Sequence, residues 1–341
     1  MIIIVRNFFD LDIDSGRKLR AIENLLCAHG EGRHVLWMPI ELVSALQSVE
    51  CLSSYSQRVL VELKSSVLET RKIEDFFDFY LEVDFSRKLP SGYSEGRICV
   101  SYVVVSTSSF LQKTVFLTEN LLDGEAFSKG AEVFVFKNKM ISAVCRVDFD
   151  FYNGGGSTTF DVFRVLKEQG KLFCCIVDSD KEHPKASLGS TAKRFNRVGV
   201  GYGESYYFEI LDCHEIENIL PKDLLLKVAE ENWTGGAIFA REELLSFRQY
   251  ADHKSGLTLA AGRALDFKHF DTYWDGFYDG DEDEWLCEPL GAEILEKCVE
   301  KMNQLSIRDL SEMINFEIDQ GWLRLSRLVA SWGVGMKRSI N

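Results

Sequence analysis

The pattern of apolar and polar positions divides the chain into three stretches, of which the first covers residues 1–98. It opens with a short run, Ile2 to Val5, that predicts a strand, and it continues with apolar residues at helical spacing. Two helical stripes are visible: Leu19, Ile22, Leu25 and Leu26, and then Val59, Leu60, Leu63 and Val67. We therefore expect a helix-rich N-terminal domain that ends near residues 88–95, where Leu-Pro-Ser-Gly is typical of a loop.

The second stretch, residues 99–221, alternates short β-branched and aromatic runs with helical segments. We expect strands at residues 99–106, 114–117, 144–151, 172–177 and 206–211, and helices at residues 121–133 and 159–169. Strands that alternate with helices favour right-handed crossovers and a parallel sheet. The sequence thus predicts an α/β domain, with a parallel sheet flanked by helices.

The third stretch, residues 222–341, is again helical, and no repeat of fixed period is visible in the chain. The expected helices are residues 224–231, 241–250, 292–303 and 307–328. They are interrupted at residues 271–288 by a segment with eight acidic residues, no Lys or Arg, and five interleaved aromatics. Its spacing does not match a calcium loop. The aromatics either dock on the chain's own core or anchor a partner through Trp274, Phe277 and Trp285.

Composition is that of a folded protein, with 46% hydrophobic residues, 27% charged residues and only 5 prolines. No apolar run approaches the roughly 18 residues that span a bilayer, and the first residues lack a signal-peptide pattern, so a cytoplasmic location without membrane contact is expected. The nine cysteines form no Cys-x-x-Cys pair, which favours reduced thiols. Cys174 and Cys175 lie in an apolar run and are interpreted as core residues.

A net charge of −14 disfavours non-specific adhesion to nucleic acids. It does not exclude enzymes that act on DNA, because a site built from metal-binding carboxylates is itself acidic.

Carboxylates follow three of the expected strands. They are Glu119 and Asp123, then Asp178 and Asp180, and finally Glu215 and Glu217. Ligands of open α/β sheets bind at the carboxyl ends of the strands, so the six acids are expected to converge there. If the backbone stays extended, Asp178 and Asp180 project from one face. Oxygen ligands suit Mg²⁺ or Mn²⁺. The alternative is that each acid only caps a helix or ends a strand.

These motifs resemble the TOPRIM fold of topoisomerases, primases and the OLD-family nucleases. The matching segments are residues 115–123 with Glu-x-x-x-Asp, the glycine turn at 153–157, the Asp-x-Asp at 178–180, and His-Glu-Ile-Glu-Asn at 214–218. The resemblance covers residues 113–221 and is strongest to the OLD branch. It departs at Asn120, where TOPRIM domains usually have glycine, and no Walker ATPase motif is present.

The resemblance implies that two metal ions for phosphodiester hydrolysis are held by Glu119, Asp123, Asp178, Asp180 and one or both of Glu215 and Glu217. Glu119, Asp178 and Asp180 would be catalytic residues. Between the Asp-x-Asp and the last strand lies a basic segment, residues 181–201, whose cations are Lys181, Lys185, Lys193, Arg194 and Arg197. We expect it to bind nucleic acid, with Lys193 stabilising transition-state charge, unless it is an ordinary solvated loop. The glycine turn could bind phosphate or only form a tight turn, and His183 and His214 are expected in packing or surface roles.

The leading hypothesis is a metal-dependent DNA endonuclease with a TOPRIM-like domain between helical terminal regions. By resemblance, the missing ATPase would be a separate subunit of a bacterial system for defence against phage or plasmids, and the chain could also form a homo-oligomer. The alternative is a non-catalytic TOPRIM scaffold that binds nucleic acid or a partner in DNA repair or complex assembly. Strand passage and primer synthesis lack support because no nucleophilic tyrosine context or polymerase domain is recognisable.

Overall fold

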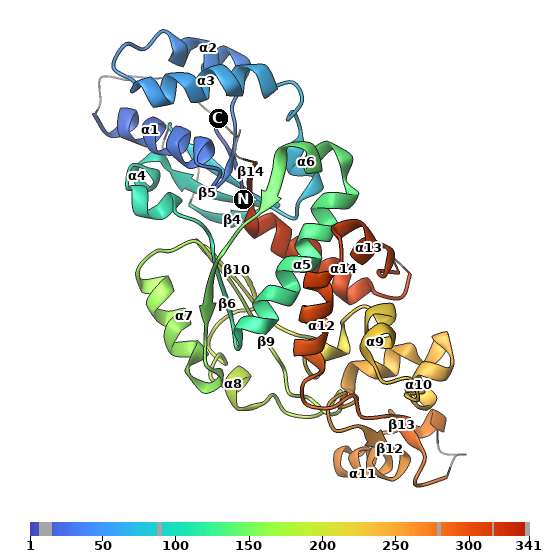
Figure 1. Ribbon diagram of the computed structural model, residues 1–341. Helices are drawn as coiled ribbons and strands as arrows, with labels where there is room; N and C mark the ends of the chain where they lie inside the picture. The colour runs from blue at the N-terminus through green and yellow to red at the C-terminus, as the bar shows by residue number, and fades with distance from the viewer. Residues whose placement is uncertain (7–15, 87–90, 278–280, 316, 338–341) are drawn as a thin grey trace.

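Two five-stranded sheets, each with helices packed on it, form the body of the molecule (Figure 1). The computed structural model describes residues 1–6, 16–86, 91–277, 281–315 and 317–337. The α/β class expected from the sequence is confirmed. No helix in those ranges is both long and apolar enough to cross a membrane.

The first sheet lies in the region expected to be helix-rich. Its order is β2-β1-β3-β5-β4, in which β4 is antiparallel to β5 and the other neighbours are parallel. The strands are β1 (Ile2–Ile4), β2 (Val35–Trp37), β3 (Tyr80–Asp84), β4 (Gly92–Ser94) and β5 (Arg97–Ser101). The expected helices are present, as α1 (Gly16–Gly30), α2 (Ile40–Gln47) and α3 (Ser54–Ser66), but they cover an unforeseen sheet. The predicted domain boundary, between residues 98 and 99, falls inside β5.

The second sheet has the order β10-β11-β9-β6-β8, with β10 antiparallel to β11 and the other neighbours parallel. Its strands are β6 (Val115–Thr118), β8 (Asp150–Asn153), β9 (Phe173–Val177), β10 (Gly201–Tyr202) and β11 (Tyr206–Ile210). The run expected as one strand at residues 144–151 is divided between β7 (Cys145–Val147) and β8, which lie in different sheets. Residues 99–106 likewise end β5 and then form α4 (Tyr102–Val105).

The two sheets share one topology. When the five strands of each are numbered in chain order, both sheets read 2-1-3-5-4, with the fourth strand antiparallel to the fifth. The chain thus contains a repeat of topology, although its sequence shows no repeat of fixed period. A sequence search for a fixed period misses this repeat, because the connections between equivalent strands differ in length.

The central strands β6 and β9 of the second sheet are buried on both faces, and their side chains alternate between the two. On one face, Val115 and Leu117 of β6 pack with Phe163 of α7 (Thr159–Glu168). On the opposite face, Phe116 packs with Phe127 of α5 (Leu121–Lys137). This second face belongs to the larger core, which continues into the first sheet. The two sheets thus share a core and do not form independent domains.

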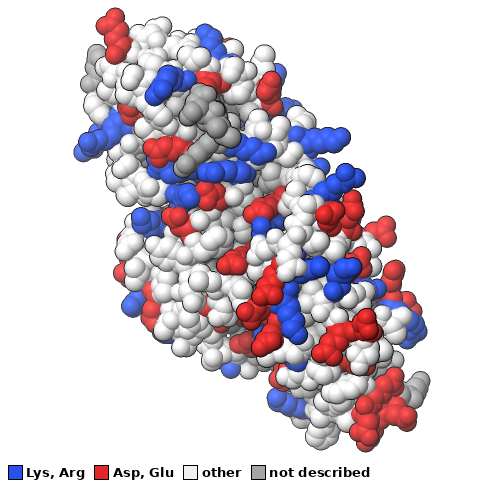
Figure 2. All heavy atoms as spheres, viewed as in Figure 1, with Lys and Arg blue, Asp and Glu red and all other residues white. Residues whose placement is uncertain are grey.

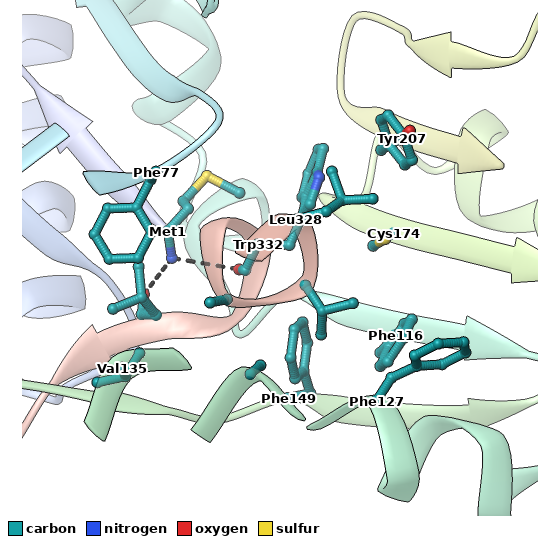
Figure 3. Packing of buried hydrophobic residues seen from close by; sticks show 14 of the residues in the cluster. Met1, Phe77, Phe116, Phe127, Val135, Phe149, Cys174, Tyr207, Leu328 and Trp332 are labelled. Carbon is teal, nitrogen blue, oxygen red and sulfur yellow. Dashed lines mark hydrogen bonds between the residues drawn. The ribbon is translucent and has the colours of Figure 1, made fainter. Parts of the chain in front are cut away.

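The C-terminal helix α14 (Gln320–Gly333) packs along α5 and lies between the two sheets (Figure 3). Its Trp332 contacts Phe79 of the first sheet region, at 4.6 Å between ring centroids. After α14, β14 (Val334–Met336) pairs with β7, and the amine of Met1 donates hydrogen bonds to the carbonyl oxygens of Trp332 and Val334. The C-terminal region is therefore not a separate helical domain. The helix predicted at residues 307–328 is broken into α13 (Ile307–Glu312) and α14.

The remaining C-terminal elements form a lobe at one end of the molecule (Figure 1). They are α9 (Lys222–Val228), α10 (Ala237–Ala240), the 3-10 helix η5 (Glu242–Tyr250), α11 (Leu259–His269), and the pair β12 (Leu257–Thr258) and β13 (Trp285–Cys287). Helix α12 (Ile294–Gln304) packs on both α9 and α5. Trp274 is fully buried and contacts Phe247, and Phe277 packs on the same ring. Trp274 therefore docks on the chain's own core and cannot anchor a partner, whereas Trp285 is 38% exposed. Figure 2 shows acidic side chains gathered at this end.

Candidate active site

The carboxyl ends of three parallel strands meet at one point of the second sheet. Glu119 follows β6, and its Oε1 accepts a hydrogen bond from the main-chain N–H of Asp178, which follows β9, at 3.2 Å. Asp178 Oδ1 in turn accepts from the N–H of Ile216, in the turn after β11, at 3.1 Å. The structure thus links the ends of β6, β9 and β11 through carboxylates, in the order that the sequence predicted.

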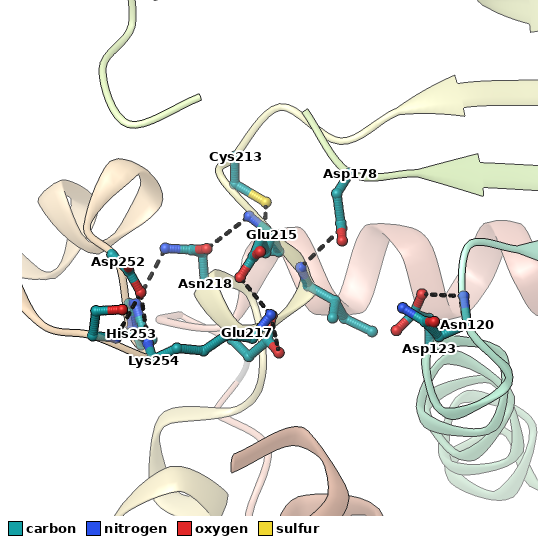
Figure 4. Close-up of polar contacts among 12 residues, drawn as sticks. Asn120, Asp123, Asp178, Cys213, Glu215, Glu217, Asn218, Asp252, His253 and Lys254 are labelled. Atoms are coloured by element: carbon teal, nitrogen blue, oxygen red, sulfur yellow. Dashed lines mark hydrogen bonds and ion pairs between the residues drawn. The ribbon is translucent and has the colours of Figure 1, made fainter. Parts of the chain in front are cut away.

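Asp123 lies in the first turn of α5 and is almost completely buried (Figure 4). Its Oδ2 accepts from the main-chain N–H of Asn120 at 3.0 Å, which closes a capping box at the start of the helix. Burial, aided by the charges of Glu217 and Glu119, raises the pKa of Asp123 to about 7. The capping role foreseen as an alternative is therefore present, together with an unusual electrostatic environment.

Neighbouring carboxylates also raise the pKa values of other acids at this edge of the sheet. Burial raises the pKa of Asp178 well above its ordinary value, and the carboxylates of Asp123 and Glu217 raise it further. Burial also raises the pKa of Glu119, with Asp180 and Glu215 adding to the effect. Six carboxylates therefore act on one another at this edge of the sheet, which is the expected property of a site that accepts cations.

Asp180 does not continue the extended strand. β9 ends at Val177, and Asp180 has a left-handed backbone with φ of 53°. The backbone is therefore not extended here, and the expectation that Asp178 and Asp180 project from the same face of a strand is wrong. Asp180 is placed instead by the loop, because its N–H donates to the carbonyl oxygen of His214 at 2.9 Å and its side chain lies against Gly189, where an added Cβ would clash.

Lys254, which no sequence motif revealed, lies between two of the expected ligands (Figure 4). Its Nζ is 2.7 Å from Glu215 Oε2 and 3.2 Å from Glu217 Oε1. Burial alone would lower the pKa of Lys254, but Glu217 and Glu215 outweigh that effect and raise it. Glu217 Oε2 is buried and has no hydrogen-bond partner.

The donor set suits a hard divalent cation, because every candidate ligand is a carboxylate and one buried carboxylate oxygen is unpaired. Within the described residues, however, no three carboxylate, histidine or cysteine side chains are already arranged to hold a metal ion. Lys254 supplies the positive charge at Glu215 and Glu217. Metal binding there would require these side chains to rearrange, and the two expected ions stay a prediction.

The basic segment flanks the same edge. Thr191 of α8 (Ser190–Lys193) hydrogen-bonds the carboxylate of Glu119, which brings this helix and its last residue, Lys193, beside the site. Arg194 pairs with Asp161 at 3.1 Å and Lys185 with Asp271 at 3.0 Å. Lys181, Lys193 and Arg197 make no ion pair with the described part of the chain, so these three are the cations left for an anionic ligand.

Three other candidates have structural roles. The N–H groups of Gly154 and Gly155 donate to the carbonyl oxygens of Thr118 and Glu119, at 2.8 and 3.0 Å. These two donors of the glycine turn are therefore not free to bind a phosphate. His183 is buried, with Nε2 at 3.0 Å from Asp266 Oδ1, and it fastens the basic segment to α11. The cysteines are all free, and Cys174 and Cys175 are fully buried in the sheet.

Comparison of the chain with models of known families, with curated proteins and with solved structures found no match. The functional argument therefore depends on the geometry.

Proposed function

We propose that this chain is a metal-dependent DNA endonuclease of the TOPRIM, OLD-like kind. The observation that carries the proposal is the pair of hydrogen bonds from Asp178 N–H to Glu119 and from Ile216 N–H to Asp178. They bring the acidic ends of three parallel strands together in the chain order that the TOPRIM resemblance implies. The strand order β11-β9-β6-β8 puts these ends at the middle of the sheet.

Mg²⁺ or Mn²⁺ ions bound there would activate water and stabilise the leaving oxygen of a phosphodiester. Glu119, Asp123, Asp178, Asp180, Glu215 and Glu217 are the proposed ligands. Burial and repulsion between carboxylates raise the pKa values of Glu119, Asp123 and Asp178, and this repulsion favours cation uptake. Lys193 and Arg197 would hold the phosphate backbone, and Lys254 keeps Glu215 and Glu217 in place until metal arrives.

The resemblance supports a cytoplasmic setting in which a separate ATPase, or another subunit of a bacterial defence system, controls the nuclease. Among the described aromatic residues of the acidic segment, Trp285 is exposed enough to contribute to such an interface.

One observation favours a second candidate, a non-catalytic scaffold. Lys254 already neutralises Glu215 and Glu217, and the described residues contain no ready-made metal cluster. A scaffold of this kind would bind nucleic acid without cutting it.

The deciding experiment incubates the purified chain with supercoiled, linear and single-stranded DNA in Mg²⁺, Mn²⁺ or EDTA. We expect cleavage that requires metal and is abolished in Asp178→Asn. Asp84→Asn is the matched control, because Asp84 is a buried carboxylate at the end of the third strand of the other sheet. DNA binding without cleavage in all of these conditions would favour the scaffold.

A further inference from the structure

Arg248 is a buried cation without an acidic partner. It is 7% exposed, and its Nη2 donates to the carbonyl oxygens of Glu217 and Leu220 at 3.2 and 2.9 Å. Its Nε is buried and has no hydrogen-bond partner. In the described ranges of the chain, no carboxylate lies within 4.0 Å of this guanidinium. Such a group is costly to bury unless an anion completes its surroundings.

The acid with the strongest electrostatic effect on Arg248 is Asp319, but its oxygens are used elsewhere. Asp319 Oδ1 accepts from the N–H of Lys222 at 3.1 Å, and Oδ2 accepts from the N–H of Asn315 at 2.8 Å. The carboxylate of Asp319 therefore connects the loop before α14 to the first residue of α9. It makes no hydrogen bond to the Nε of Arg248.

Arg248 lines a cavity of about 360 Å³ between the end of β11, η5 and the start of α14. This volume lies within the range of small-ligand sites. Polar lining is supplied by Ser246, Gln249 and Arg324, and Asp212 and Asp319 also contribute to the wall. Glu209 pairs with both terminal nitrogens of Arg324, so Arg248 is the lining arginine whose charge has no carboxylate pair.

We propose that this cavity binds a small phosphate monoester, with Arg248 as the group that receives the phosphate. A guanidinium presents several N–H donors in one plane and matches phosphate oxygens. The cavity admits a molecule of mononucleotide size, and it is too small for a duplex.

The same contacts connect the cavity to the candidate active site. Arg248 holds the carbonyl oxygen of Glu217, and Asn218 Nδ2 donates back to the carbonyl oxygen of Arg248 at 2.6 Å. Glu217 in turn contacts Lys254. An anion that draws the guanidinium toward the cavity shifts the turn that carries Glu215 and Glu217. This regulatory consequence rests on the proposed nuclease function, whereas the binding itself does not.

Calorimetric titration of the full-length chain with AMP and with inorganic phosphate tests the binding. We expect saturable binding of AMP to the wild type and a loss of affinity of at least about tenfold in Arg248→Met. Because Arg248→Met removes contacts of the Glu217 turn and can unfold it, a second variant keeps the arginine. Ser246→Trp blocks the mouth of the cavity, where Ser246 is exposed, and should lose AMP binding with an unchanged melting temperature.

The control is Arg308→Met, which removes an exposed guanidinium paired only with Glu312 on α13. Wild type that binds neither probe, or Ser246→Trp that binds AMP as the wild type does, overturns the proposal. A 5′-phosphorylated oligonucleotide distinguishes the source of the phosphate. If it binds through Arg248 and AMP does not, the site takes a nucleic-acid end and the small-molecule assignment is wrong.

Discussion

Lys254 Nζ lies 3.2 Å from Glu217 Oε1, while Oε2 of the same buried carboxylate has no partner. Lys254 is thus the counter-ion of a buried acid that would otherwise have no ion-pair partner. Replacing Lys254 therefore tests whether the acids need a positive charge, from lysine or from a metal ion, for the stability of the fold.

We expect Lys254→Met to lower the free energy of unfolding in EDTA by about 1–3 kcal/mol, because two carboxylates lose their cation. Mg²⁺ or Mn²⁺ should restore the loss and raise the melting temperature of the variant more than that of the wild type. Lys297→Met, at an exposed position of α12, is the control. A variant whose stability is indifferent to divalent ions would show that the acids do not gather metal.

The raised pKa of Asp123 predicts a particular pH dependence of stability. In the folded protein this carboxyl group titrates at about 7, against an ordinary value of 3.8, so between these values the folded state binds more protons than the unfolded state. In EDTA, the free energy of unfolding should therefore fall as the pH rises from about 4 to about 7, and the contribution of Asp123 should level off above that. The difference corresponds to at most about 4 kcal/mol.

Asp123→Asn keeps an oxygen for the N–H of Asn120 and removes the titration. Chemical denaturation between pH 4.5 and 8 should show a shallower profile for this variant than for the wild type. Parallel profiles would mean that Asp123 has an ordinary pKa.

Gly189 is expected to be indispensable to the position of Asp180. A methyl group at Gly189 would overlap the side chain of Asp180, so Gly189→Ala should cost about 1–3 kcal/mol and abolish cleavage by displacing that carboxylate. Gly199→Ala is a matched control in the same segment, because open space surrounds Gly199. Melting temperatures and a DNA cleavage assay check both variants, and equal behaviour of the two would remove Asp180 from the site.

The cations without acidic partners should carry nucleic-acid binding. Replacing Lys193 and Arg197 together by alanine should reduce the slope of log affinity against log salt by about two, or about one for each phosphate contact. Arg194→Ala should have a smaller effect, because Arg194 already pairs with Asp161. The control replaces Arg58 and Lys64 of α3. An unchanged slope in the double variant would identify the segment as a solvated loop.

The sequence predicted the second sheet well, because β6, β9 and β11 are buried runs followed by acids. It identified β1 but not the rest of the first sheet as a sheet, because β2 and β4 have three residues each and are too short to show an alternating pattern. Lys254 could not be found, since a single lysine far along the chain from Glu217 is recognisable only after folding. The left-handed backbone of Asp180 was equally hidden, because an aspartate at the end of a strand gives no sign that the strand direction is lost there.

The common 2-1-3-5-4 order provides a comparison within the molecule. Arg6 follows the first strand of one sheet and Glu119 follows the first strand of the other, and the surrounding sequences, Arg-Asn-Phe-Phe-Asp at 6–10 and Glu-Asn-Leu-Leu-Asp at 119–123, differ most in the sign of that first charge. Asp84 is the last residue of the third strand of the first sheet and Asp178 directly follows the third strand of the second, and each comes after a valine. One half of the protein thus pairs its arginine with Glu74 at 2.6 Å, and the other half presents a carboxylate at the equivalent point. The first sheet is therefore a natural counterpart with the strand order of the second, in which an arginine follows the first strand where a glutamate follows that of the second.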